Sequence, residues 1–103
     1  MPSDRTIAAA FNALAHPRRV HLFRLLVDQP EIGQSVNQLE AATGFSRAVL
    51  LHHLRILEAA GVVARQRKGS SVSQILRPSP LLAAMREVDR QLTPKPVAQR
   101  DVA

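Results

Sequence analysis

The chain contains no cysteine among its 103 residues. This absence excludes disulfide bonds, thiolate metal sites and thiol redox sensing together. No apolar run approaches the roughly 18 to 20 residues that a membrane-spanning helix requires. The first four residues, Met-Pro-Ser-Asp, lack the basic and apolar regions of a signal peptide. We therefore expect a cytoplasmic protein that does not associate with a membrane.

Acidic residues are also scarce. Eight Asp and Glu stand against fourteen Lys and Arg, which gives a formal net charge of +6 at pH 7. No paired carboxylates, nucleophile or phosphate-binding motif is present, so we expect no catalytic site, no metal and no cofactor. The positive charge favours a polyanionic partner over an acidic substrate, although composition alone fits a generically basic soluble protein equally well.

Two helices are predicted in the first third of a chain whose length suits a single domain. The stripe Ile7, Phe11 and Leu14 has helical spacing and predicts a helix that ends near Ala15. Pro17 then begins a second helix, because proline fits the first helical turn, and His16 before it is expected to be a cap or turn residue. This second helix, apolar on most of its circumference and running to about residue 28, is predicted to be the buried central helix.

The next segment has the pattern of a helix-turn-helix. Ser35 with Gln38 three residues later predicts a capping box that opens a short helix. Gly44 predicts its end, because glycine readily adopts the left-handed conformation found at helix C-termini. Ser46 then predicts the N-cap of a longer helix that runs to about Ala60. Two helices joined by so tight a turn are typical of the helix-turn-helix motif.

Residues 62–76 alternate as strands do, around a tip of Lys68, Gly69 and Ser70, and predict a β-hairpin wing. A last helix begins at Ser79-Pro80. The predicted fold is therefore mainly α with a small β-hairpin, a winged helix-turn-helix of order α-α-α-α-β-β-α. We assign residues 1–92 to this domain and expect residues 93–103 to be a disordered tail.

The helix that begins at Ser46 has one apolar face, formed by Leu50, Leu54 and Leu57, with His53 on its flank. The opposite face offers the guanidinium, imidazole and small apolar groups that suit base edges and phosphates in the major groove. Residues 47–77 hold six Lys or Arg and a single acid, Glu58. We predict double-stranded DNA as the partner. The candidate contacts are Ser46, Arg47, Ala48, Leu51, His52 and Arg55 on the helix, and Arg65, Arg67, Lys68 and Ser70 on the wing.

Several assignments stay open from sequence alone. Leu51 can meet a thymine methyl or pack against the neighbouring helix, and Arg18 and Arg19 can bind phosphate or simply face solvent. A function of another class also stays open, in which the winged helix is a protein-protein interaction module whose basic surface binds an acidic partner. That alternative predicts an exposed apolar patch around Leu51 on the long helix.

These segments resemble the ArsR/SmtB family of bacterial winged-helix regulators. Residues 13–19 resemble the family's "LADPTRL" segment, residues 44–57 its recognition helix, and residues 60–69 its entry into the wing. The resemblance covers about residues 7 to 90. It implies a homodimer, joined by the first and last helices, that binds an imperfect inverted repeat near a promoter and usually represses. The expected dimer contacts are Ile7, Phe11, Leu81, Met85, Val88 and Leu92.

The chain departs from the family where relatives bind metals. Ser35-Val36-Asn37 stands where metal-sensing members carry a Cys-Val-Cys triplet, and no histidine follows His53 to supply ligands on the last helix. We therefore do not carry metal sensing over. Leu51 replaces the usual recognition-helix serine, and Ser70 stands where arginine often follows the wing glycine. The sequence leaves the effector, the operator and the choice between repression and activation open.

Overall fold

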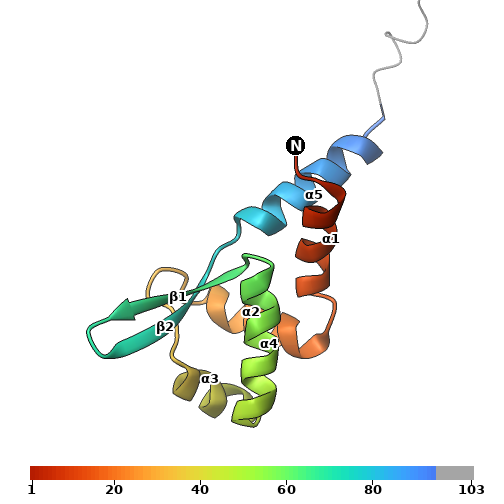
Figure 1. Ribbon diagram of the computed structural model, residues 1–103. Helices are drawn as coiled ribbons and strands as arrows, with labels where there is room; N and C mark the ends of the chain where they lie inside the picture. The colour runs from red at the N-terminus through yellow and green to blue at the C-terminus, as the bar shows by residue number, and fades with distance from the viewer. Residues whose placement is uncertain (95–103) are drawn as a thin grey trace, which may run out of the picture.

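The computed structural model describes residues 1–94, in which five helices accompany one antiparallel hairpin (Figure 1). The elements are α1 (Asp4–Ala13), α2 (Pro17–Val27), α3 (Val36–Thr43), α4 (Arg47–Ala59), β1 (Val63–Lys68), β2 (Ser71–Leu76) and α5 (Ser79–Leu92). This order confirms the predicted winged helix-turn-helix. No helix in the described part of the chain is long and apolar enough to span a membrane. Most of the tail predicted to be disordered, residues 95–103, lies outside the described residues.

Side-chain caps begin the first four helices, where backbone N–H groups would otherwise lack partners. The Ser3, Ser35 and Ser46 hydroxyls and the His16 imidazole accept from the backbone N–H groups of Thr6, Gln38, Val49 and Arg18 respectively. At α3 the Gln38 side chain also accepts from the backbone N–H of Ser35, which completes the predicted capping box. The predicted role of His16 as a cap is confirmed.

Two glycines make the turns that place α3. Gly44 ends the helix in the left-handed conformation, at φ 73°, as its sequence position predicts. Gly33, at φ 74°, has a further reason to be glycine, since an added Cβ would lie 2.5 Å from the carbonyl oxygen of Gln74. The next residue, Gln34, exchanges both backbone hydrogen bonds with Gln74. The base of the wing is thereby anchored to the loop before α3.

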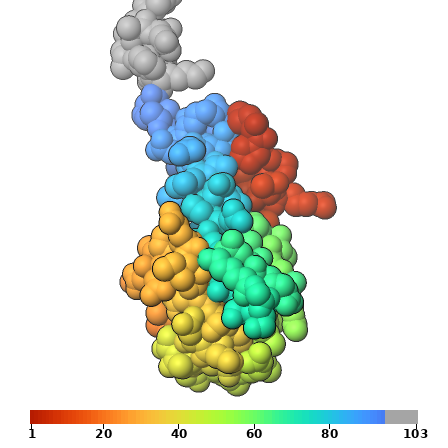
Figure 2. All heavy atoms as spheres, turned by 90° about the vertical axis from the view of Figure 1, so that its left-hand side faces the viewer, coloured from red at the N-terminus to blue at the C-terminus, as the bar shows by residue number. Residues whose placement is uncertain are grey.

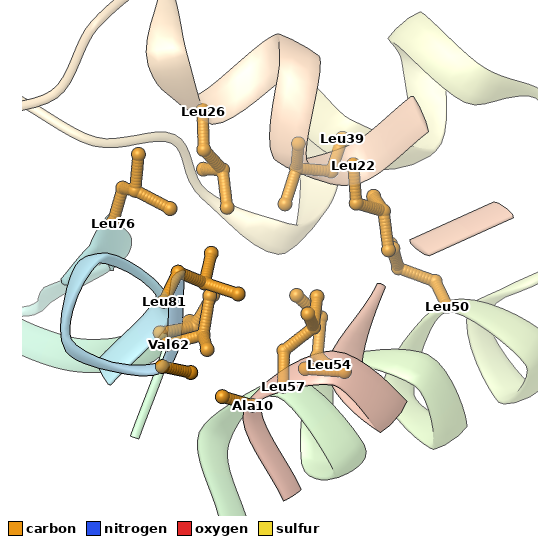
Figure 3. Close-up of a cluster of buried hydrophobic side chains, with 13 residues drawn as sticks. Ala10, Leu22, Leu26, Leu39, Leu50, Leu54, Leu57, Val62, Leu76 and Leu81 are labelled. Atoms are coloured by element: carbon orange, nitrogen blue, oxygen red, sulfur yellow. The ribbon is translucent and has the colours of Figure 1, made fainter. Parts of the chain in front are cut away.

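One hydrophobic core joins every helix to the wing (Figure 3). Leucines from α2, α3 and α4 meet Val62, Leu76 and Leu81 there. The expectation that α2 is the buried central helix holds on one side of the helix only, where Leu22 and Leu26 join the core. Only Arg19, Leu22 and Leu26 of α2 are buried, while Val27 is exposed, because the other elements pack on one side of the helix.

The prediction for the last helix needs one correction. Leu81 is 4% exposed and belongs to the core of a single chain, so it is not free to contact a partner. The reason is the entry into α5, where the backbone N–H of Arg77 bonds to the carbonyl of Val62 at 2.7 Å and holds the start of the helix over the core. Ile7 of α1 is also half-buried against the core.

Arg19 links α1, α2 and α4 from inside the fold, although sequence suggested phosphate or solvent as its surroundings. The residue is only 7% exposed. Its guanidinium donates to the carbonyl oxygens of Ala13 at 3.0 Å and Asn12 at 3.1 Å, and to Nδ1 of His53 on α4 at 3.2 Å. The Ala13 carbonyl at the end of α1 thereby gains a charged donor, and the Asn12 carbonyl, which also accepts from the backbone N–H of Ala15, gains a second donor.

His53 is the titratable member of this contact. Burial lowers the pKa of its imidazole below the ordinary value of 6.5, and the nearby basic side chains, His16 first and Arg19 second, lower it further. Because arginine is only a donor, Nδ1 of His53 accepts and the ring proton of the neutral form lies on Nε2. The folded chain therefore holds His53 neutral.

Replacing Arg19 by Ala should lower the free energy of unfolding by about 2 to 4 kcal/mol, because three charge-assisted hydrogen bonds disappear inside the fold. Urea unfolding at one fixed protein concentration measures the change. Arg24→Ala, an exposed arginine on the same helix, is the matched control and should change stability by less than about 0.5 kcal/mol. A loss from Arg19→Ala as small as the control's would show that the contact is not structural.

Stability should also fall as the pH drops through about 6.5. The unfolded chain binds a proton at His53 with the ordinary pKa, whereas the folded chain has a lower one. In the window between these values the unfolded state binds more protons, so the contribution is complete above 6.5 and declines below it. Urea unfolding from pH 7.5 to 5.5 should show this slope, and His53→Gln should flatten it. Identical slopes in the two proteins would refute the assignment.

Candidate nucleic-acid interface

The helix-turn-helix consists of α3 and α4 (Figure 1). The side chains of α4 form two unlike faces. Leu50, His53, Leu54 and Leu57 are buried on the inner face, three of them as predicted and His53 more deeply than its expected place on the flank. The outer face carries Ala48, His52 and Arg55, all exposed. Burial of the leucines therefore fixes which side chains α4 presents to solvent.

Two of the three remaining candidates on this helix, Ser46 and Leu51, have roles within the folded chain. The Ser46 hydroxyl caps α4 through the backbone N–H of Val49 at 3.3 Å. Leu51 is half-buried and packs against the core, which supports the second of its two predicted roles. No large apolar side chain of α4 is exposed. The outer face is polar and basic, with only small apolar groups.

Two of the predicted DNA-binding arginines form ion pairs in the free chain. Arg47 Nη1 lies 2.7 Å from Oε1 of Glu40 on α3, and Arg65 Nε lies 3.2 Å from Oε1 of Glu58 on α4. The four side chains are between 32% and 65% exposed. Each pair therefore contributes only about 0 to 1 kcal/mol to the free energy of unfolding. A phosphate can compete for either guanidinium at little cost.

The wing carries its positive charge toward the tip. β1 and β2 pair antiparallel with Arg67 opposite Val72 and Lys68 opposite Ser71, and Gly69 turns the chain at φ 63°. Arg67, Lys68 and Ser70 are all exposed. Among residues 1–94, Arg55, Arg67 and Lys68 form no ion pair. The outer face of α4 and the tip of the wing thus each carry exposed cations that no acidic side chain of the described residues neutralises.

A hollow of about 650 Å³ separates α4 from the wing. Arg55 and Arg65 line it, together with Gln74 of β2, a residue that is not among the predicted contacts. Gln74 is buried, and its side-chain oxygen has no hydrogen-bond partner within the described residues. Gln74 pairs with Arg65 across the hairpin, which the alternation of the two strands can predict. Nothing in the sequence indicates that the Gln74 side chain is buried.

Three histidine rings lie in a row beside α4. The ring centroids of His16 and His53 are 4.6 Å apart, and those of His53 and His52 are 5.2 Å apart. Over residues 1–94, no three His, Cys, Asp or Glu side chains gather as a set that could hold a metal ion. The three rings instead line the side of α4 next to the start of α2.

The family model described as "Bacterial regulatory protein, arsR family" matches residues 16–65, from the cap of α2 to the start of the wing. The uncharacterized HTH-type transcriptional regulator Rv0081 of Mycobacterium tuberculosis is 35% identical over 91 residues, which cover 84% of this chain and 77% of the relative. Its crystal structure superposes with a TM-score of 0.64 at 32% identity, covering 100% of this chain and 99% of that one.

Two further solved structures share the fold. The ArsR family transcriptional regulator RHA00566 gives a TM-score of 0.74 at 20% identity, covering 87% of this chain and 90% of that one. The homodimeric winged helix-turn-helix DNA-binding domain of Mb0332 from Mycobacterium bovis gives a TM-score of 0.65 at 24% identity, covering 87% of this chain and 88% of that one. This chain therefore belongs to the arsR family of bacterial regulatory proteins and is a transcriptional regulator with a winged helix-turn-helix DNA-binding domain.

Proposed function

We propose that this chain is a homodimeric repressor that binds an inverted-repeat operator through α4 and the wing, without a metal effector. The observation that carries the proposal is the outer face of α4, where Ala48, His52 and Arg55 are exposed beside a basic wing. The proposal includes repression because a dimer bound to an operator at a promoter blocks access of RNA polymerase to the DNA. The chain has no thiolate with which to sense a soft metal.

The roles of the DNA-facing residues differ. Arg55 is exposed on the outer face and forms no ion pair among the described residues, so its guanidinium is available to bond to the O6 and N7 atoms of a guanine. Ala48 is small and exposed and suits a thymine methyl group. Lys68 and Arg67 at the wing suit phosphates, which position the protein without selecting a sequence. Arg47 and Arg65 also bind phosphates, once their guanidinium groups leave the carboxylates of Glu40 and Glu58.

The dimer is supported by an exposed apolar face on the helix pair α1 and α5. Figure 2 shows this pair rising from one end of the winged core. The exposed apolar side chains of the pair are Phe11, Leu82, Met85, Val88 and Leu92. Met85 is 54% and Leu92 77% exposed, and burial against a second copy would remove that apolar surface from water. The homodimeric state named for the domain of Mb0332 agrees with this proposal.

The one buried carboxylate near this face is already compensated. Arg90 and Gln91 both donate hydrogen bonds to Glu87, at 2.7 and 2.9 Å. Hydrogen bonding from Arg90 first, and from Gln91 second, lowers the pKa of Glu87 to about 2. The group is therefore ionised at every physiological pH, and its charge is neutralised within the same helix. Glu87 therefore needs no partner from a second copy, and the apolar side chains determine the proposed dimer interface.

A protein-interaction module is the alternative, and it required an exposed apolar patch at Leu51. That side chain packs against the core instead, and α4 exposes no large apolar group. The observation that favoured the alternative is therefore missing. DNA binding accounts better for a polar outer face flanked by cations.

Arg55→Ala should remove most of the sequence selectivity. A duplex selected by binding from a random-sequence library should bind about 5- to 150-fold more weakly, the loss of one bidentate base contact, while a scrambled duplex loses much less. Lys68→Ala is the comparison, and it should weaken both duplexes by the same factor. Fluorescence anisotropy at several salt concentrations measures both effects. Unchanged selectivity in Arg55→Ala would contradict the assigned base contact.

Met85→Glu should convert the dimer to a monomer, because it places a charge in the centre of the proposed interface. Light scattering gives the molar mass, and affinity for the selected duplex should fall by about 100-fold or more once two half-sites no longer bind together. Ile32→Glu is the matched control, since Ile32 is an equally apolar side chain, 67% exposed, on the loop before α3. A Met85→Glu variant that stays dimeric would rule out this face.

A further inference from the structure

The flank of α4 that lies away from the wing carries an open basic cradle of about 390 Å³. We use the name basic cradle for the site formed by His16, Arg18 and Arg19 of the α2 start with His52 and His53 of α4. Ala48 and Val49 complete its lining, and no acidic side chain takes part. Neither the family assignment nor the wing accounts for such a site.

The cradle and the wing lie on opposite flanks of one helix. Ala48 and His52 belong both to the cradle and to the outer face of α4, whereas Arg55 and Glu58 border the hollow beside the wing. The major groove of DNA is about 12 Å wide and has a phosphate backbone along each edge. When the outer face of α4 enters the groove and the wing meets one edge, the cradle faces the other.

Arg18 is the exposed cation of the cradle, and its side chain is already oriented. Its guanidinium carbon lies 5.5 Å from the centre of the Phe45 ring, in the turn of the helix-turn-helix. Within residues 1–94 it forms no ion pair. Stacking on Phe45 limits the rotamers of Arg18, so less conformational entropy is lost when it binds an anion.

The other groups of the cradle divide into two kinds. Arg19 is buried and bonds to the neutral His53 ring, so its guanidinium adds positive potential without reaching a ligand. His52 is exposed, and its ring lies against that of His53. The lowered pKa of His53, caused by burial first and then by the surrounding basic groups, agrees with a concentration of positive charge at this place.

The geometry points to the basic cradle as a binding site for a backbone phosphate of DNA, on the groove edge opposite the wing, with Arg18 as the main donor and His52 as the second. This inference rests on the proposed function and extends the DNA contact from α4 and the wing to the start of α2. A phosphate contact of this kind positions the recognition helix and is independent of base sequence.

Arg18→Ala tests the site against Arg24→Ala, which removes an exposed arginine farther along the same helix. The selected duplex and a scrambled duplex should both bind Arg18→Ala about 3- to 10-fold more weakly near 100 mM salt, by the same factor. The slope of log affinity against log salt should be shallower by about 0.9, the value for one phosphate. Arg24→Ala should bind as the wild type does. Thermal unfolding verifies that both variants are folded.

Arg18→Lys should recover part of the lost affinity, because it restores the charge without the planar donor pair. If Arg18→Ala binds DNA with the affinity and salt slope of the wild type, the cradle is not a phosphate site and this inference is overturned. If Arg55→Ala loses selectivity in the same assay, the proposed function still holds. Weaker binding of inorganic phosphate by Arg18→Ala, with DNA binding unchanged, identifies a free-anion site and also overturns it. A wild-type protein that selects no duplex overturns the proposed function itself.

Discussion

Burial of one face of α4 is the constraint on which the rest of the molecule depends. Leu50, Leu54 and Leu57 must leave water, and the core formed by α2, α3, the wing and α5 is the place that receives them. Because successive helical residues turn by 100°, this burial also determines that Ala48, His52 and Arg55 face outward. The core contacts and the proposed DNA contacts therefore lie on opposite sides of the same helix.

Polar contacts then fix how the neighbouring elements meet α4. Arg19 ties the end of α1 to His53, Gly33 lets the loop before α3 approach Gln74, and Glu58 holds Arg65 of the wing. These contacts position the start of α2 on one side of the outer face of α4 and the wing on the other. In the proposed complex, the cations on these two sides of α4 contact the phosphates along the two edges of the groove.

Local signals made much of this architecture predictable. Serine and histidine caps, the glycine after α3 and the change from helical to alternating periodicity mark the elements, and each depends on neighbours a few residues away. The inner and outer faces of α4 follow from the same periodicity. The exposed DNA-facing candidates Ala48, His52, Arg55, Arg67 and Lys68 were therefore within reach of sequence analysis, as a surface if not as a proven site.

Long-range contacts were out of reach. Arg18 and Arg19 are adjacent and chemically identical, yet one lies over Phe45 and the other is buried against Ala13 and His53. Leu81 and Met85 share a stripe on α5, but only the first meets the core. Such differences depend on where other elements cross the helix, which a single sequence does not encode in its spacing.

The central claim is that α4 contacts DNA while flanked by the wing and the start of α2. Backbone amide chemical shifts of the full chain, followed by NMR as the selected duplex is added, test it most directly. The account predicts the largest changes at the outer face of α4, at Lys68 to Ser70 and at Arg18, and none of this pattern with the scrambled duplex. Changes centred on α1 and α5, with α4 unaffected, would contradict it.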